Sequence, residues 1–220
     1  MKTFFLATYL ALKEVFRNRG RFLLVALVIA LITMLVLFIA ALGEGLGNGN
    51  RQYIANLDAD LIVFLEKSDY IISASRLEVN TARSIRRVEG VADAGAIYTS
   101  STEIVSLEEP LKVSMLGVEP GRPGMPTILE GREFRTGEAR EAVIDRNVAL
   151  RSDIKIGDTI RIRSTQGTDD EFYELKVVGL VDGQSYTFQP TIFVPPATWE
   201  KIRPQSESDM VSDTPYPNVV

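Results

Sequence analysis

The chain has 220 residues, with 24 basic and 29 acidic side chains, no cysteine and no histidine. Without cysteine there is no disulfide framework and no thiol chemistry, and without histidine the commonest general base and metal ligand are absent. Residues 1–21 carry five basic side chains against one acidic, residues 22–42 carry no charge, and residues 43–220 carry 19 basic against 28 acidic side chains. An acidic C-terminal part speaks against nucleic acid as a partner, because nucleic acid requires a basic face.

Residues 1–20 predict an amphipathic helix at the cytoplasmic face of a membrane. Phe5, Tyr9, Leu12 and Phe16 recur at spacings of four, three and four, which places them on one face of a helix. The basic residues of the segment lie away from that face or at its end, so the helix can lie among lipid headgroups. The alternative is a cytoplasmic continuation of the helix that follows.

The next segment predicts a transmembrane helix over residues 21–43. Its apolar part contains one polar side chain, Thr33, and as a helix it covers about 30 Å, the thickness of a bilayer core. A buried core helix and a cleaved signal peptide are the alternatives, but both usually have shorter uncharged runs. The expected location is the inner or plasma membrane. The preceding basic cluster predicts that the N-terminus is cytoplasmic and that residues 44–220 form an extracytoplasmic domain.

The first part of the outer domain mixes helix and strand signals. Gly43–Asn50 holds four glycines in eight residues, which predicts a flexible exit from the membrane or a frayed helix end. The apolar run Asp60–Leu65 predicts a buried strand. Ser75 and Glu78 match a capping box, which predicts a helix that Gly90 ends.

The remainder is rich in short strands separated by turns. Apolar or alternating runs bounded by Pro, Gly and acidic residues are typical of strands. Two short helices are expected at 146–150 and 197–202, which makes the fold class α+β. The predicted strands are Ala94–Tyr98, Thr102–Leu107, Leu111–Val118, Ala142–Asp145, Ile160–Arg163, Phe172–Val181 and Thr191–Val194.

No pattern predicts a catalytic, cofactor-binding or metal-binding residue. The glycines of Gly43–Asn50 follow a membrane helix rather than a strand, and they lack the Lys-Ser/Thr ending of a phosphate loop. Asp169–Glu171 lacks the alternate ligand spacing of a calcium loop. The sequence therefore predicts a protein that binds, anchors or couples, and that is not an enzyme and carries no cofactor.

The order of these parts resembles ABC-transporter permeases of the MacB/FtsX/LolC type. The most specific stretches are Ile128–Ser164 and Leu175–Gly183, which look like the outer core domain of that family. A Gly-Arg turn, a strand ending in Val-Ile-Asp, a Gly-Asp-x-Ile phrase and a Val-Val-Gly return strand follow one another in the family's order. They lie at Gly131-Arg132, Ala142–Asp145, Gly157–Ile160 and Val177–Gly179.

This resemblance implies a non-enzymatic permease subunit in the lipid bilayer. Such subunits pair with a second permease subunit, as homo- or heterodimers, and work with a cytoplasmic ABC ATPase. ATP hydrolysis moves the helices, and the outer domains export a substrate or relay a mechanical signal. An outer adaptor protein is a further partner that the resemblance allows.

Family members carry three further spans after the outer domain, whereas this sequence ends at Val220. Two interpretations therefore stay open. The chain is either the N-terminal portion of a four-span permease or a single-pass, membrane-anchored extracytoplasmic module that binds a partner. The DNA downstream of the gene distinguishes the two, because the first interpretation expects it to encode three further apolar segments. No residue pattern identifies the transported substrate.

Overall fold

The computed structural model describes residues 9, 13–14, 16–57, 59–106, 109–137, 139–186, 188–205 and 216–220, with backbone only for 46–52. The chain forms two compact units, Met1–Asn48 and Gly49–Val220. We call the second the C-terminal unit. Phe5 and Leu12, two of the four residues of the predicted amphipathic face, lie outside the described residues, so the helix over 1–20 stays a prediction.

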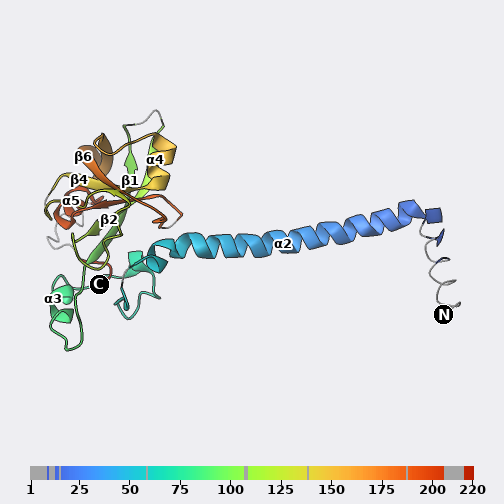
Figure 1. Ribbon diagram of the computed structural model, residues 1–220, viewed down its shortest axis with the longest axis horizontal. Helices are drawn as coiled ribbons and strands as arrows, with labels where there is room; N and C mark the ends of the chain where they lie inside the picture. Colours follow the sequence, from blue (N-terminus) through green and yellow to red (C-terminus); the bar gives the residue numbers. More distant parts are fainter. Residues whose placement is uncertain are drawn as a thin grey trace. The chain divides into compact units, whose positions relative to one another are not determined.

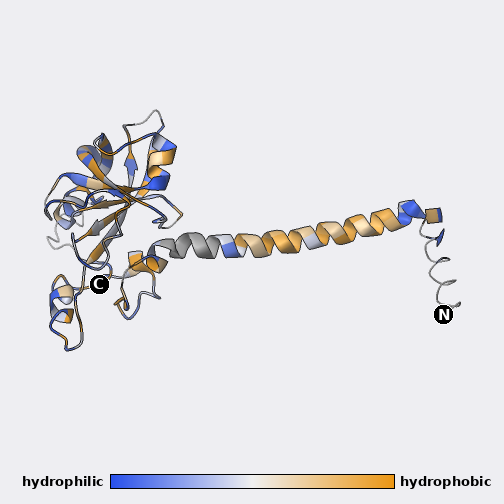
Figure 2. Ribbon diagram, in the orientation of Figure 1, coloured by the Kyte–Doolittle hydropathy of each residue, from blue (hydrophilic) through white to orange (hydrophobic). Residues whose placement is uncertain are grey.

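The dominant element before the sheet is α2, a single helix over Arg19–Ala55 (Figure 1). Its segment Arg19–Gly45 is long and apolar enough to cross a membrane. Figure 2 colours most of this segment hydrophobic, with hydrophilic residues near its two ends, and its apolar side chains are exposed rather than packed against protein. Within residues 22–42 the one polar side chain is Thr33, and it is satisfied within the helix, because its hydroxyl donates to the carbonyl of Ile29 at 2.8 Å. These properties fit a helix surrounded by lipid.

The glycine-rich stretch Gly43–Asn50 is helical, which corrects the expected flexible exit or frayed end. Each glycine disfavours a helix by about 1 kcal/mol relative to alanine. Tertiary contacts supply most helical stability in proteins, and Tyr53, in the last turn of α2, is fully buried in the C-terminal unit. Packing at the end of α2 therefore overrides the low propensity of its glycines.

Seven strands of the described residues form one mixed sheet in the order β3-β6-β4-β7-β2-β1-β5. The strand β5 also pairs with β6, so six strands close into a ring, which we call the strand ring. The pairs β4–β6 and β2–β7 are parallel, and the others are antiparallel. The bounds are β1 Ile97–Ile104, β2 Leu111–Val118, β3 Glu130–Gly131, β4 Glu141–Asp145, β5 Thr159–Gln166, β6 Asp169–Val181 and β7 Thr191–Val194.

The strand ring separates two apolar cores. Successive side chains of a strand point to opposite faces, so Ala142 and Ile144 of β4 enter one core while Val143 enters the other. The first core takes residues from all six strands of the ring and therefore fills its interior. The second lies on the outside of β2, β4, β6 and β7, and it includes Tyr53. We call these the inner core and the outer core.

Short helices complete the C-terminal unit: η1 Ile72–Ala74, α3 Thr81–Ile85, α4 Arg146–Ser152 and α5 Pro196–Ile202. Trp199 and Ile202 of α5, and Val148 of α4, belong to the inner core. One apolar helix followed by a mixed domain of helices and strands confirms the α+β class.

Two predicted elements in the first part of the C-terminal unit are wrong. Residues 60–65 form no strand, although Val63 exchanges backbone hydrogen bonds with Val220 at 2.7 and 3.4 Å. The capping box is also wrong, because α3 begins only at Thr81. The Ser75 hydroxyl instead accepts a hydrogen bond from the backbone N–H of Leu65 at 2.9 Å. Both segments serve long-range contacts that local patterns do not reveal.

The later elements agree better with the sequence. The strand Thr191–Val194 is confirmed with its predicted bounds, and Leu111–Val118 likewise. The predicted strands Ala94–Tyr98 and Thr102–Leu107 are instead one strand, β1, because Thr99 to Ser101 continue the pairing with β2 without a break.

Candidate functional site

The sequence predicted no catalytic, cofactor or metal residue, and this expectation stays a prediction. Among the described residues, no group of three or more His, Cys, Asp or Glu side chains is placed to hold a metal ion. Two other features of the C-terminal unit can serve a function. One is the attachment of the end of α2, and the other is a cationic cleft beside α5.

The end of α2 is built into the outer core through Tyr53. The side chain is 0% exposed, and its ring packs against Phe193 at 5.9 Å and Tyr186 at 6.4 Å between centroids. Its hydroxyl donates to the carbonyl of Gly124 at 3.0 Å. Burial raises the pKa of the Tyr53 hydroxyl far above its usual range, so the group remains a neutral donor.

A second contact lies three residues further along. The Asn56 side-chain amide donates to the carbonyl of Gly183 at 2.7 Å. Gly183 and Tyr186 belong to one loop between β6 and β7, so Tyr53 and Asn56 both hold that loop. We call Tyr53 and Asn56 the helix-end anchor. A buried tyrosine typically removes about 150–250 Å² from water, so this attachment resists separation of the helix end from the sheet.

Residues 216–220 meet the same outer core. Val219 is fully buried and bridges to Ile97 of β1. The Asn218 side chain accepts from the backbone N–H of Thr99 at 2.7 Å and donates to the carbonyl of Ser75 at 2.9 Å. The segment is therefore an integral part of the C-terminal unit.

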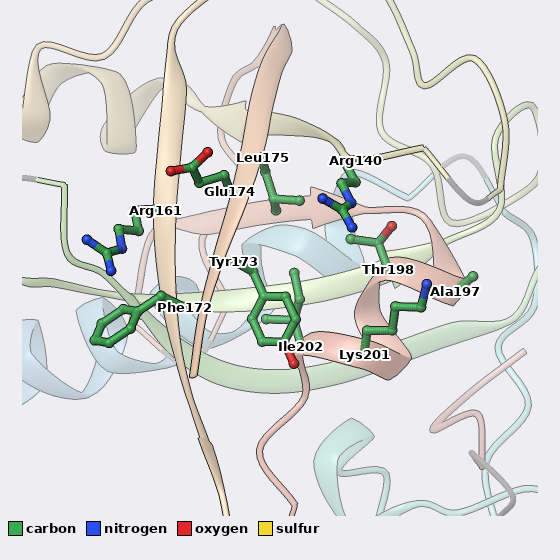
Figure 3. A pocket seen from close by; sticks show the side chains of 10 residues that line it. All are labelled: Arg140, Arg161, Phe172, Tyr173, Glu174, Leu175, Ala197, Thr198, Lys201 and Ile202. Atoms are coloured by element: carbon green, nitrogen blue, oxygen red, sulfur yellow. The ribbon is translucent and has the colours of Figure 1, made fainter. Parts of the chain in front are cut away.

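A cleft of about 810 Å³ opens between β6 and α5, and we call it the α5 cleft (Figure 3). Its volume falls within the range of small-molecule sites, and mouths of closed strand arrangements often hold such sites. Three cationic side chains and one carboxylate are among the residues that line it. They are Arg140, Arg161, Phe172, Tyr173, Glu174, Leu175, Ala197, Thr198, Lys201 and Ile202.

The α5 cleft offers charged and aromatic groups that can contact a ligand. Tyr173 is its one phenol, and burial, together with a hydrogen bond to Glu171 at 2.5 Å, raises the pKa of Tyr173 to about 12. A phenol with this pKa stays neutral near pH 7 and is a poor general base. The lining residues include no Ser, His or Cys that could act with it. The sequence did not predict this site, because its cations come from three separate segments.

Comparison with known proteins identifies a matching protein family. The family model of the MacB-like periplasmic core domain matches residues 22–215. A curated protein of Staphylococcus haemolyticus (strain JCSC1435), whose name assigns it to a hemin transport system as the permease HrtB, is 22% identical over 202 residues. The match takes in 89% of this chain and 52% of that protein, so the chain spans about half the length of this relative.

Two solved structures are also similar. The extracellular domain of the noncanonical ABC-type transporter YknZ from Gram-positive bacteria is 16% identical, with a TM-score of 0.49 over 72% of this chain and 79% of that one. The periplasmic region of MacB from Actinobacillus actinomycetemcomitans is 13% identical, with a TM-score of 0.49 over 72% of this chain and 70% of that one.

Proposed function

Because the chain belongs to the MacB-like periplasmic core domain family, we propose that it is a permease component of an ABC exporter or mechanotransmission complex. A partner ATPase hydrolyses ATP, and this chain converts the resulting helix movement into movement of its outer domain. The ATPase activity lies in the partner, so the chain itself is not an enzyme.

The observation that carries this proposal is the packing of the last turn of α2 within the C-terminal unit. One helix runs from Arg19 through Ala55, and the helix-end anchor fixes its last turn to the outer core. An unstructured tether would absorb a displacement of the helix, whereas a helix packed into a core transmits it. This connection is what a coupling element requires and what a passive membrane anchor does not need.

The proposed arrangement follows the charge pattern. Residues 1–20 lie at the cytoplasmic face, residues 21–43 cross the inner or plasma membrane, and residues 44–220 lie outside. Basic side chains next to the span, among them Arg17, Arg19 and Arg21, favour the cytoplasmic side. The partners are the lipid bilayer, a cytoplasmic ABC ATPase and a second permease subunit, with an outer adaptor protein as a further partner.

Co-purification tests the proposal. A tagged chain, expressed from its complete natural gene region, is solubilised from membranes and captured. We expect an ABC ATPase to be retained with it, also in a Tyr53→Ala variant, because the ATPase contact is cytoplasmic. Absence of any ATPase contradicts the proposal, provided that a known permease treated in parallel keeps its own ATPase.

A helix replacement separates this proposal from the alternative, a single-pass anchored binding module. Residues 22–42 are exchanged for an unrelated uncharged apolar helix of equal length, and membrane localisation is checked by fractionation. A coupling helix needs its own packing surface, so we expect the ATPase to be lost or its activity no longer to respond to the permease. Retention of both in the variant identifies the span as an interchangeable anchor.

A further inference from the structure

The α5 cleft has a one-sided distribution of charge. Arg161 lies directly opposite Glu174 in the pairing of β5 with β6, and its guanidinium stacks over the ring of Phe172 at 4.2 Å. Its positive charge is therefore partly compensated in place. Arg140 and Lys201 lie on the other side of the cleft, near Thr198 (Figure 3), whereas Glu174, the one carboxylate among the lining residues, is paired across the strands with Arg161.

The backbone of Arg140 is fixed between two elements. Its carbonyl accepts a hydrogen bond from the backbone N–H of Lys176 in β6 at 3.1 Å. The preceding carbonyl, that of Ala139, accepts from the hydroxyl of Thr198 in α5 at 2.9 Å. Thr198 is buried, so this bond is shielded from water. Arg140 is thereby held in the same cleft as Lys201, which lies one helical turn after Ala197 on α5.

The ring of Tyr173 lines the cleft near these cations. Leu175 and Ile202 are each 1% exposed and belong to the inner core, and the half-buried ring of Tyr173 packs against that core. A ligand in the cleft therefore meets two positive charges at one side and the ring of Tyr173, whereas Leu175 and Ile202 lie almost wholly below the surface. A carboxylate bound between the two cations would accept charge-assisted hydrogen bonds from both.

We propose that the α5 cleft binds a small organic anion, with its carboxylate held by Arg140 and Lys201 and its apolar body lying against Tyr173. The volume of about 810 Å³ suits a small molecule rather than a folded partner. The C-terminal unit is acidic as a whole, so this local concentration of positive charge selects anions against the surrounding field. The proposal does not depend on the transport function and holds for an anchored binding module as well.

The test uses 2-naphthoate, a water-soluble aromatic carboxylate, and the full chain embedded in lipid nanodiscs. Isothermal titration, corrected with empty nanodiscs, is expected to show one site per chain. Neutral 2-naphthalenemethanol has the same ring system without the charge, and we expect it to bind at least about tenfold more weakly, the effect of losing a charge-assisted hydrogen bond.

Variants assign the site. Arg140→Gln and Lys201→Gln are each expected to lower the affinity for 2-naphthoate about tenfold. Arg151→Gln removes a charge from the exposed face of α4 and is expected to leave the affinity within about twofold. Lys201 is exposed, so its variant tests the site even if Arg140→Gln disturbs folding. Absence of 2-naphthoate binding, equal binding of the alcohol, or unchanged affinity in both cleft variants would overturn the proposal.

Discussion

Tyr53 is the residue on which the connection between α2 and the sheet depends most. It is fully buried, lies between Phe193 and Tyr186, and donates its hydroxyl to Gly124. The ring and the hydroxyl make separable contributions, because phenylalanine retains the packing and removes only the hydrogen bond. This separation turns the structural role of Tyr53 into a graded prediction.

We expect Tyr53→Ala to lower the free energy of unfolding of the C-terminal unit by about 3–5 kcal/mol, as for other buried aromatic truncations. Tyr53→Phe should cost about 1 kcal/mol, the net value of one hydrogen bond. Urea unfolding in detergent measures both, with fluorescence of Trp199 as the reporter, since it is the one tryptophan of the chain and is buried in the inner core. Tyr9→Ala, at an exposed position, serves as control. Equal stability of Tyr53→Ala and the wild type would contradict the role of Tyr53 in the helix-end anchor.

The ion pair of Glu141 with Arg132 makes the free energy of unfolding depend on pH. Hydrogen bonds from Arg132, at 2.5 and 3.0 Å, hold the pKa of the Glu141 carboxyl below its usual range. A carboxyl whose pKa is lowered by folding adds stability above its unfolded pKa, and this stability is lost as the pH falls through the folded pKa. Because Arg132 is partly exposed, solvent screening reduces the contribution.

We therefore expect Glu141→Gln to reduce the free energy of unfolding by about 1–2 kcal/mol at pH 7, and the difference from the wild type to shrink toward about pH 3. Thermal unfolding at several pH values measures this. Glu89→Gln, a charge loss at an exposed position, should show no such pH-dependent difference. A difference that is constant from pH 7 to pH 3 would show that the carboxylate charge is not its source.

At the scale of elements, the C-terminal end of β3 depends on a glycine. Gly131 has a φ of +85°, and a Cβ added there would lie 2.3 Å from the carbonyl oxygen of Val178 in β6. This close approach lets Arg132 donate its backbone N–H to Val178 at 3.0 Å. The Gly-Arg phrase of the sequence is thus explained by the pairing of β3 with β6.

Gly131→Ala should destabilise the C-terminal unit by at least about 1–3 kcal/mol, from the left-handed backbone alone, with the steric clash in addition. Gly137→Ala is the matched control, because nothing lies within 4 Å of its added Cβ and its φ is not in the left-handed region. Unfolding monitored by Trp199 fluorescence compares the two. Similar stabilities of both variants would contradict the close packing of β3 on β6.

Local sequence patterns predicted strands that are short runs bounded by turn residues. Strand β7 was predicted because Thr191–Val194 is a short apolar run stopped by prolines, and β2 because its run follows the turn sequence Glu108-Glu109-Pro110. Residues 60–65 have the same apolar character, but a single backbone pairing with Val220 replaces a strand there. Which apolar run enters a sheet depends on partners distant in the sequence.

Neither candidate site could be predicted from the sequence, for the same reason. Tyr53 follows a glycine-rich stretch that predicts a break, and its partners Gly124 and Phe193 lie 71 and 140 positions away. Arg140, Arg161 and Lys201 belong to three segments that meet only because the strand ring closes and α5 covers its mouth. The spacing of residues along the chain does not predict contacts between such distant segments.

At the scale of the whole molecule, α2 joins an apolar span to a closed mixed sheet through one continuous helix. The chain belongs to the MacB-like periplasmic core domain family, which supports a permease component of an ABC transporter. In the proposed complex, ATP binding or hydrolysis inside moves α2, and the helix-end anchor moves the outer domain with it. The central claim is therefore a movement that depends on ATP and on Tyr53.

The chain contains no cysteine, so a single Arg151→Cys substitution on exposed α4 accepts one spin label. Pulsed EPR on the complex of permease subunits and ATPase in nanodiscs then measures the distance between the labels of two protomers, with and without ATP. We predict that ATP shifts this distance in the wild-type background, and that Tyr53→Ala abolishes the shift while the ATPase stays bound. An unchanged distance on ATP addition in the wild type, or the same shift in Tyr53→Ala, would contradict the coupling role of the helix-end anchor.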